Sequence, residues 1–107
     1  MEGKYSKKDW MLFRSKIGEW QENYIDRLNQ EYINLLSKPC LPSEKVWELE
    51  KRIREDKHSP GVQIKMSRSD LFLNVLSLLK HGVIQIEDLD EFSPEFREKV
   101  EAFFHHS

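Results

Sequence analysis

The side chains that most often carry out acid–base or metal chemistry are few in this chain and are scattered along it. Its four histidines are His58, His81, His105 and His106. None has a second histidine or a cysteine at the spacing that directs two ligands to one metal within a helix or turn. His81 follows an apolar segment, where the dipole of a helix favours a cation, so we interpret it as a structural residue.

The single cysteine and the C-terminal acids give no stronger chemical signal. Cys40 lies between two prolines without a nearby base in the sequence, and it has no second cysteine for an intramolecular disulfide, which favours a reducing compartment. The acids of residues 87–91 lack the glycine and the alternating ligand order of a calcium loop. Glycine-rich phosphate loops and nucleophile elbows are absent from the sequence. We therefore expect no enzyme activity, cofactor, metal or small-molecule ligand.

Basic residues are concentrated in residues 51–68, with six Lys or Arg against two acids. The alternating residues 62–66, followed by a capped helix and then Gly82, resemble the order of elements in ribbon-helix-helix DNA-binding proteins. The resemblance is interrupted by an acidic segment after Gly82 and by Ser93-Pro94. The alternative function is therefore a nucleic-acid-binding module. The resemblance implies that bases or phosphates would be contacted by Arg54, Lys57, Gln63, Lys65 and Arg68.

These residues must be positioned by helices, of which the first is the longest. Residues 10–36 contain no proline and one glycine, and large apolar side chains recur every three or four residues. Ser6 is a suitable N-cap, with Asp9 completing a capping box, and Pro39 ends the helix. The aromatic face of this helix is larger than three further helices are expected to cover, which predicts an interface. The proposed interface residues are Trp10, Phe13, Ile17, Trp20, Tyr24 and Tyr32.

A second helix is predicted to begin after Ser43 and to be mostly solvated. Ten of the residues 44–57 are charged, and Val46, Leu49 and Ile53 form a narrow apolar stripe beside Trp47. A turn at Ser59-Pro60-Gly61 ends this helix.

The remaining residues predict a buried helix and a final capped helix. Residues 71–79 are apolar at seven of nine positions, which is typical of the centre of a domain, and Ser67 with Asp70 forms a capping box before them. Ser93-Pro94 begins the last helix. Residues 62–66 and 83–86 have extended character and are predicted to pair as a minor two-strand ribbon.

Together these features predict a single all-α domain over residues 1–107, a small helical bundle with one long N-terminal helix. The longest apolar run, residues 71–79, is far below the roughly 20 residues that span a bilayer, and no leader-like segment precedes the first helix. We therefore expect a cytoplasmic protein. The leading hypothesis is a protein-interaction module or homodimer without catalytic activity, acting on a protein partner or on itself.

Several segments resemble those of short bacterial helical proteins that are uncharacterised and often carry the label "multidrug transporter". These segments are residues 47–57, 60–62, 82–84 and 88–93. The resemblance covers nearly the whole chain and implies a small helical bacterial protein. It implies no activity, partner or site residue, because none is established for that family.

Overall fold

The structure is a computed structural model that describes residues 6–106. All of its regular structure is helical, as predicted. The four α-helices and two 3₁₀ turns are α1 (Lys7–Leu36), α2 (Pro42–Asp56), η1 (Arg68–Asp70), α3 (Leu71–Lys80), η2 (Ile86–Leu89) and α4 (Pro94–His105).

The predicted ribbon between residues 62–66 and 83–86 is wrong, since residues 6–106 contain no strand. The backbone of each segment is hydrogen-bonded elsewhere. The amides of Val62 and Gln63 both donate to the Ser59 carbonyl, and the amide of Val83 donates to Leu78 at the end of α3. Local turn and cap bonds therefore take the place of a ladder between the two segments.

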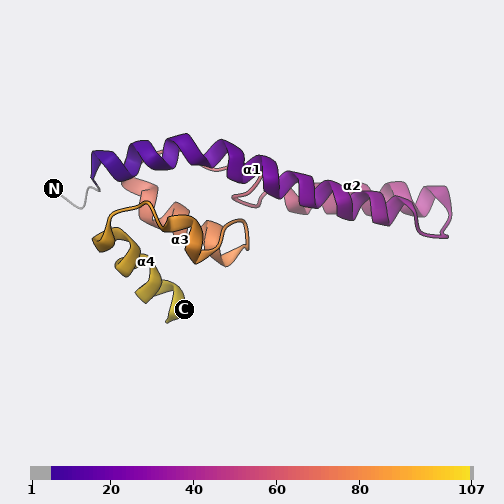
Figure 1. Ribbon diagram of the computed structural model, residues 1–107. Helices are drawn as coiled ribbons and strands as arrows, with labels where there is room; N and C mark the ends of the chain where they lie inside the picture. The colour runs from indigo at the N-terminus through magenta and orange to yellow at the C-terminus, as the bar shows by residue number, and fades with distance from the viewer. Residues whose placement is uncertain (1–5, 107) are drawn as a thin grey trace.

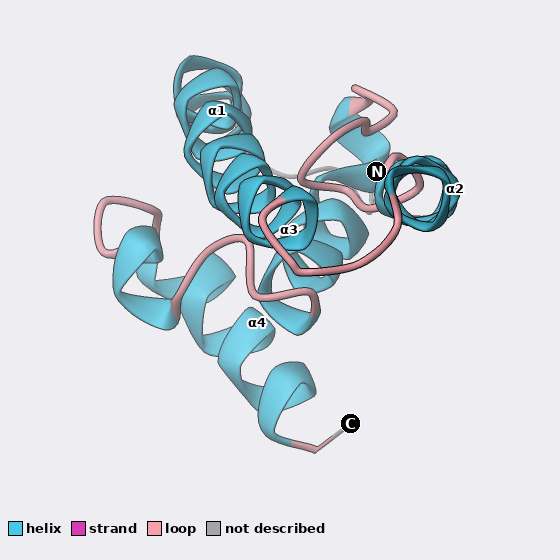
Figure 2. Ribbon diagram, turned by 90° about the vertical axis from the view of Figure 1, so that its right-hand side faces the viewer, coloured by secondary structure: helices cyan, strands magenta, loops and turns pink. Residues whose placement is uncertain are grey.

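α1 extends along most of a molecule that measures 56 × 24 × 21 Å. One half of this helix packs with α3 and α4, whereas the other half lies beside α2 (Figure 1). Figure 2 shows α2 and α4 on different sides of α1. The molecule thus has a globular end and a helical hairpin that projects from it.

The hydrophobic core belongs to the globular end. α3 is its centre, as the sequence predicts, with Leu71, Val75 and Leu78 fully buried. Trp20 of α1 stacks on Phe92 with ring centroids 6.5 Å apart, and Phe92 stacks on Phe96 at 5.4 Å. The aromatic side chains of α1 and α4 therefore close the core around α3.

The starts of α1 and α4 are joined by one buried carboxylate. The Ser6 hydroxyl accepts a hydrogen bond from the Asp9 amide, which confirms the predicted cap of α1. The Asp9 carboxylate turns away to α4, where Oδ1 accepts from the Ser93 amide at 2.9 Å and Oδ2 accepts from the Ser93 hydroxyl at 2.6 Å. Ser93 in turn caps α4 by accepting from the Phe96 amide. Asp9 is therefore a contact between elements rather than the second half of a capping box.

The other two helix starts differ from their predicted caps. α2 begins one residue before Ser43, with Pro42 in its first turn and Leu41 as N-cap, because the fixed φ of proline suits that position. The Glu44 carboxylate accepts from the Leu41 amide at 3.4 Å. Ser67 precedes a 3₁₀ turn, so α3 itself begins only at Leu71.

The middle of α1 holds two loops against the helix. Gln21 donates to the Pro60 carbonyl at 3.1 Å, and the Tyr24 ring covers buried Gly61. Arg27 stacks on Tyr24 and donates to the Gly82 carbonyl at 2.9 Å. Gly82 itself has a positive φ of 70°. The apolar stripe of α1 is interrupted at Arg27 because loops rather than helices contact the helix there.

Candidate interaction surface

The hairpin formed by α2 and the C-terminal half of α1 has a narrow seam. α1 contributes the buried side chains of Leu28 and Leu35. The half-buried residues of α2 recur every three or four positions, so one edge of α2 faces α1. These residues are Lys45, Leu49, Arg52 and Asp56. No residue from Pro42 to Asp56 is buried, which leaves most of α2 outside the seam.

Polar contacts hold much of this seam together. The Tyr32 hydroxyl donates to Asp56 Oδ2 at 2.7 Å, and Arg52 lies over the Tyr32 ring while pairing with Glu31 at 2.5 Å. Lys45 donates to the Leu36 carbonyl at 2.9 Å. Burial and the hydrogen bond to Asp56 raise the pKa of Tyr32 to about 12. The seam therefore depends on specific polar partners as well as on apolar packing.

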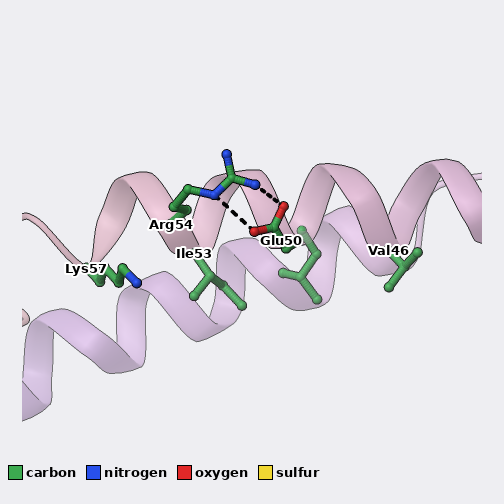
Figure 3. A pocket seen from close by; sticks show the side chains of 6 residues that line it. Val46, Glu50, Ile53, Arg54 and Lys57 are labelled. Atoms are coloured by element: carbon green, nitrogen blue, oxygen red, sulfur yellow. Dashed lines mark hydrogen bonds and ion pairs between the residues drawn. The ribbon is translucent and has the colours of Figure 1, made fainter.

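An apolar groove runs along α2 on one side of this seam. Val46, Leu49 and Ile53 line it, and its volume is about 410 Å³. Val46 and Ile53 are 51% and 44% exposed. Figure 3 shows both side chains on the face of the hairpin between the two helices. We call this surface, completed by Glu50, Arg54 and Lys57, the α2 groove.

The rim of the α2 groove is charged. Arg54 Nε donates to Glu50 Oε2 at 3.0 Å, and a second bond joins the two side chains (Figure 3). The hydrogen bond from Arg54 lowers the pKa of the Glu50 carboxyl. Lys57 continues the rim toward the end of α2. An apolar floor with a charged rim is the composition of many protein interfaces.

Further apolar side chains are exposed around the tip of the hairpin. Leu36 shares a face of α1 with Tyr32, one turn earlier, and is 46% exposed. Leu41 and Trp47 are exposed as well. Cys40 lies among them, in the exposed connection between α1 and α2.

A second hollow, of about 380 Å³, lies between the middle of α1 and η2 and is lined mainly by acids. Lys16 pairs with Glu91 at 2.7 Å, and this hydrogen bond lowers the pKa of the Glu91 carboxyl. Within residues 6–106, no group of three His, Cys, Asp or Glu side chains is arranged to hold a metal ion.

The aromatic face predicted as an interface is largely occupied within the chain. Phe13, Ile17 and Trp20 are buried in the core, and Trp10 and Tyr24 pack against its edge. The remaining member, Tyr32, lies in the seam of the hairpin. Exposed apolar side chains at helical spacing, Val46 and Ile53, lie on α2 instead. In the sequence these residues are visible as the Val46, Leu49 and Ile53 stripe. The many charged residues around them led to the prediction that this helix is mostly solvated.

The residues predicted to contact nucleic acid do not form one surface with a ribbon. Arg54 and Lys57 belong to the rim of the α2 groove, whereas Gln63 and Lys65 are exposed in the segment between α2 and η1. Arg68 begins η1. Because residues 6–106 lack a strand, the element that would enter the major groove is missing from this part of the chain.

Comparisons of this chain with protein-family models, with curated proteins and with solved structures find no match. The resemblance to short bacterial proteins therefore stays a prediction. Among the helices of residues 6–106, none combines the length and the apolar character needed to cross a membrane.

Proposed function

We propose that this chain is a protein-interaction module that binds an amphipathic helix in the α2 groove. The observation that carries the proposal is the position of Val46, Leu49 and Ile53, which are spaced at helical intervals on a helix with no buried residue. Helix-in-groove recognition uses anchors with this spacing. The function is thus binding rather than a reaction.

The energetics of α2 support this proposal. A helix of 15 residues is marginal in water by itself, and most helical stability in proteins comes from packing an apolar face. In α2 the edge that packs on α1 is largely polar, and two of the three stripe residues, Val46 and Ile53, stay exposed. A second helix laid along the stripe would remove Val46 and Ile53 from water, with roughly 25 cal/mol gained for each Å² of apolar surface buried.

The proposal is tested by photocrosslinking in the cells that produce the protein. A photoreactive phenylalanine analogue is placed at Val46, at Ile53 or at Glu55, which is exposed and lies on the opposite side of α2 by helical spacing. We expect protein adducts from positions 46 and 53 and few from position 55. The absence of adducts at positions 46 and 53, or equal adducts at all three, would overturn the proposal.

A further inference from the structure

We propose that the helix bound in the α2 groove is α2 of a second copy of this chain, aligned antiparallel, so that two hairpins form a four-helix bundle. This inference rests on the proposed function, because it names the occupant of the same groove. It is carried by three properties of the hairpin: the distribution of charge along α2, the symmetry of its apolar stripe, and its position outside the globular end.

The charge of α2 is divided between its two halves. The acidic half, residues 44–50, has three acids against one lysine, whereas the basic half, residues 51–57, has four Lys or Arg against two acids. In an antiparallel pair of α2 helices, the acidic half of each copy lies beside the basic half of the other. A parallel pair would instead place like charges together, which is unfavourable.

The apolar stripe has the symmetry that such a pair requires. A two-fold interface is self-complementary, so each residue contacts the symmetry-related position on the partner. Val46 and Ile53 lie three and four residues from Leu49, on either side of it. With the two-fold axis near Leu49, Val46 of one copy meets Ile53 of the other, and each removes an exposed apolar side chain from water.

The hairpin is also free to pair along its length. It projects from the globular end, so a second hairpin can lie against it without meeting the core (Figure 1). Two helical hairpins packed side by side give a four-helix bundle, in which each apolar stripe finds a partner. The exposed Leu36 side chain of α1 extends the same contact toward the tip.

The first test is the oligomeric state of the purified full chain by sedimentation equilibrium over the micromolar range. We expect a concentration-dependent dimer. The Val46→Glu/Ile53→Glu variant should weaken dimerisation by at least about a hundredfold, since central apolar anchors carry most of the binding energy. Circular dichroism checks that this variant keeps its helices.

A matched control adds the same charge to the other side of the hairpin. Gln30 and Asn34 are exposed on the face of α1 that points away from α2 by helical spacing, so Gln30→Glu/Asn34→Glu should leave the dimer intact. A dimer that survives Val46→Glu/Ile53→Glu, or that is lost equally in the control, would overturn the assignment of the interface.

The orientation is tested with spin labels on Cys40, the sole cysteine of the chain, near the tip of the hairpin. Antiparallel pairing places the two labels at opposite ends of the bundle, whereas parallel pairing places them together. A short distance between the labels would overturn the antiparallel arrangement.

The oligomeric state and the crosslinks separate the two proposals. A strict monomer with adducts to another protein at positions 46 and 53 would overturn self-association and support the proposed function. A strict monomer without adducts would overturn both.

Discussion

At the scale of single residues, small differences in local space decide what a substitution does. Gly18 is part of α1 and Gly61 lies against it, but the two glycines have different surroundings. A Cβ built on Gly18 meets no described atom within 4 Å, whereas one on Gly61 overlaps the Tyr24 ring. Glycine is therefore required at one position and only tolerated at the other.

Gly61→Ala is expected to lower the free energy of unfolding by about 1–3 kcal/mol, because the Tyr24 ring would have to move. Gly18→Ala is expected to raise it by about 0.5–1 kcal/mol, since alanine is the better helix former and meets no clash. Urea denaturation measures both. Equal effects of the two substitutions would contradict the difference in packing.

The hydroxyl of Tyr32 should make the hairpin sensitive to high pH. Its pKa is raised from 10.0 to about 12 in the folded chain, so the folded state retains the proton more strongly than the unfolded state does. Its contribution to stability is therefore fully present below pH 10 and is lost as the pH rises toward about 12. We expect Tyr32→Phe to lack this part of the alkaline decline.

The measurement for Tyr32 is the unfolding free energy at a series of alkaline pH values for the two proteins. Tyrosinate absorbance of the folded chain gives an independent reading, since the component lost in Tyr32→Phe should titrate near pH 12. A component that titrates near pH 10 would mean that Tyr32 is neither buried in the seam nor hydrogen-bonded to Asp56.

At the scale of elements, the contact between Asp9 and Ser93 determines how α1 and α4 meet. The carboxylate accepts from both the amide and the hydroxyl of Ser93 and is only 2% exposed. It thus joins residues that are 84 positions apart in sequence. Loss of the carboxylate would leave a partly buried amide without its acceptor.

Asp9→Ala is expected to cost about 1–3 kcal/mol of stability, and Ser93→Ala about 1 kcal/mol through the lost cap and hydrogen bond. Because the two side chains contact each other, the double variant should cost less than the two single changes together. A double-mutant cycle by thermal or urea denaturation measures this coupling. Strict additivity would argue against the contact.

The sequence predicts the elements of this fold better than it predicts how they meet. The long first helix, the buried third helix and the Ser93 cap follow from local patterns, which periodicity and capping residues report directly. The contacts of Asp9 with Ser93 and of Arg27 with Gly82 depend on residues far apart in the chain. Periodicity within one segment contains no information about such contacts.

The residues of the proposed α2 groove were not among the predicted interface residues for a related reason. The aromatic stripe of α1 has the composition of an interface and of a core alike, and Phe13, Ile17 and Trp20 turn out to be core. The sequence does show an apolar stripe formed by Val46, Leu49 and Ile53. Only the structure shows which edge of α2 packs against α1. The prediction of a two-strand ribbon was wrong because alternation of apolar and polar residues in one segment does not specify a partner strand.

At the scale of the whole molecule, the globular end and the hairpin differ in how much they bury. Six residues of α3 are buried, against none between Pro42 and Asp56. Local opening is easiest where few apolar contacts must be broken. The hairpin should therefore open before the core does.

Amide hydrogen exchange at low protein concentration is expected to be faster throughout α2 than in α3. If two hairpins pair, raising the concentration should slow exchange in α2 and leave α3 nearly unchanged. Mass spectrometry of peptides from each helix measures both effects. Equal protection of α2 and α3 against exchange in a monomer would contradict the inference that α2 is held less firmly than α3.

The continuity of α1 has a mechanical consequence. Its 30 residues correspond to a rod of about 45 Å, and its interior has no proline to bend it. The same rod forms part of the core at one end and half of the hairpin at the other. A protein bound along the hairpin, as proposed, would be kept at a fixed distance from whatever contacts α3 or α4, so α1 would act as a spacer between two surfaces of one small chain.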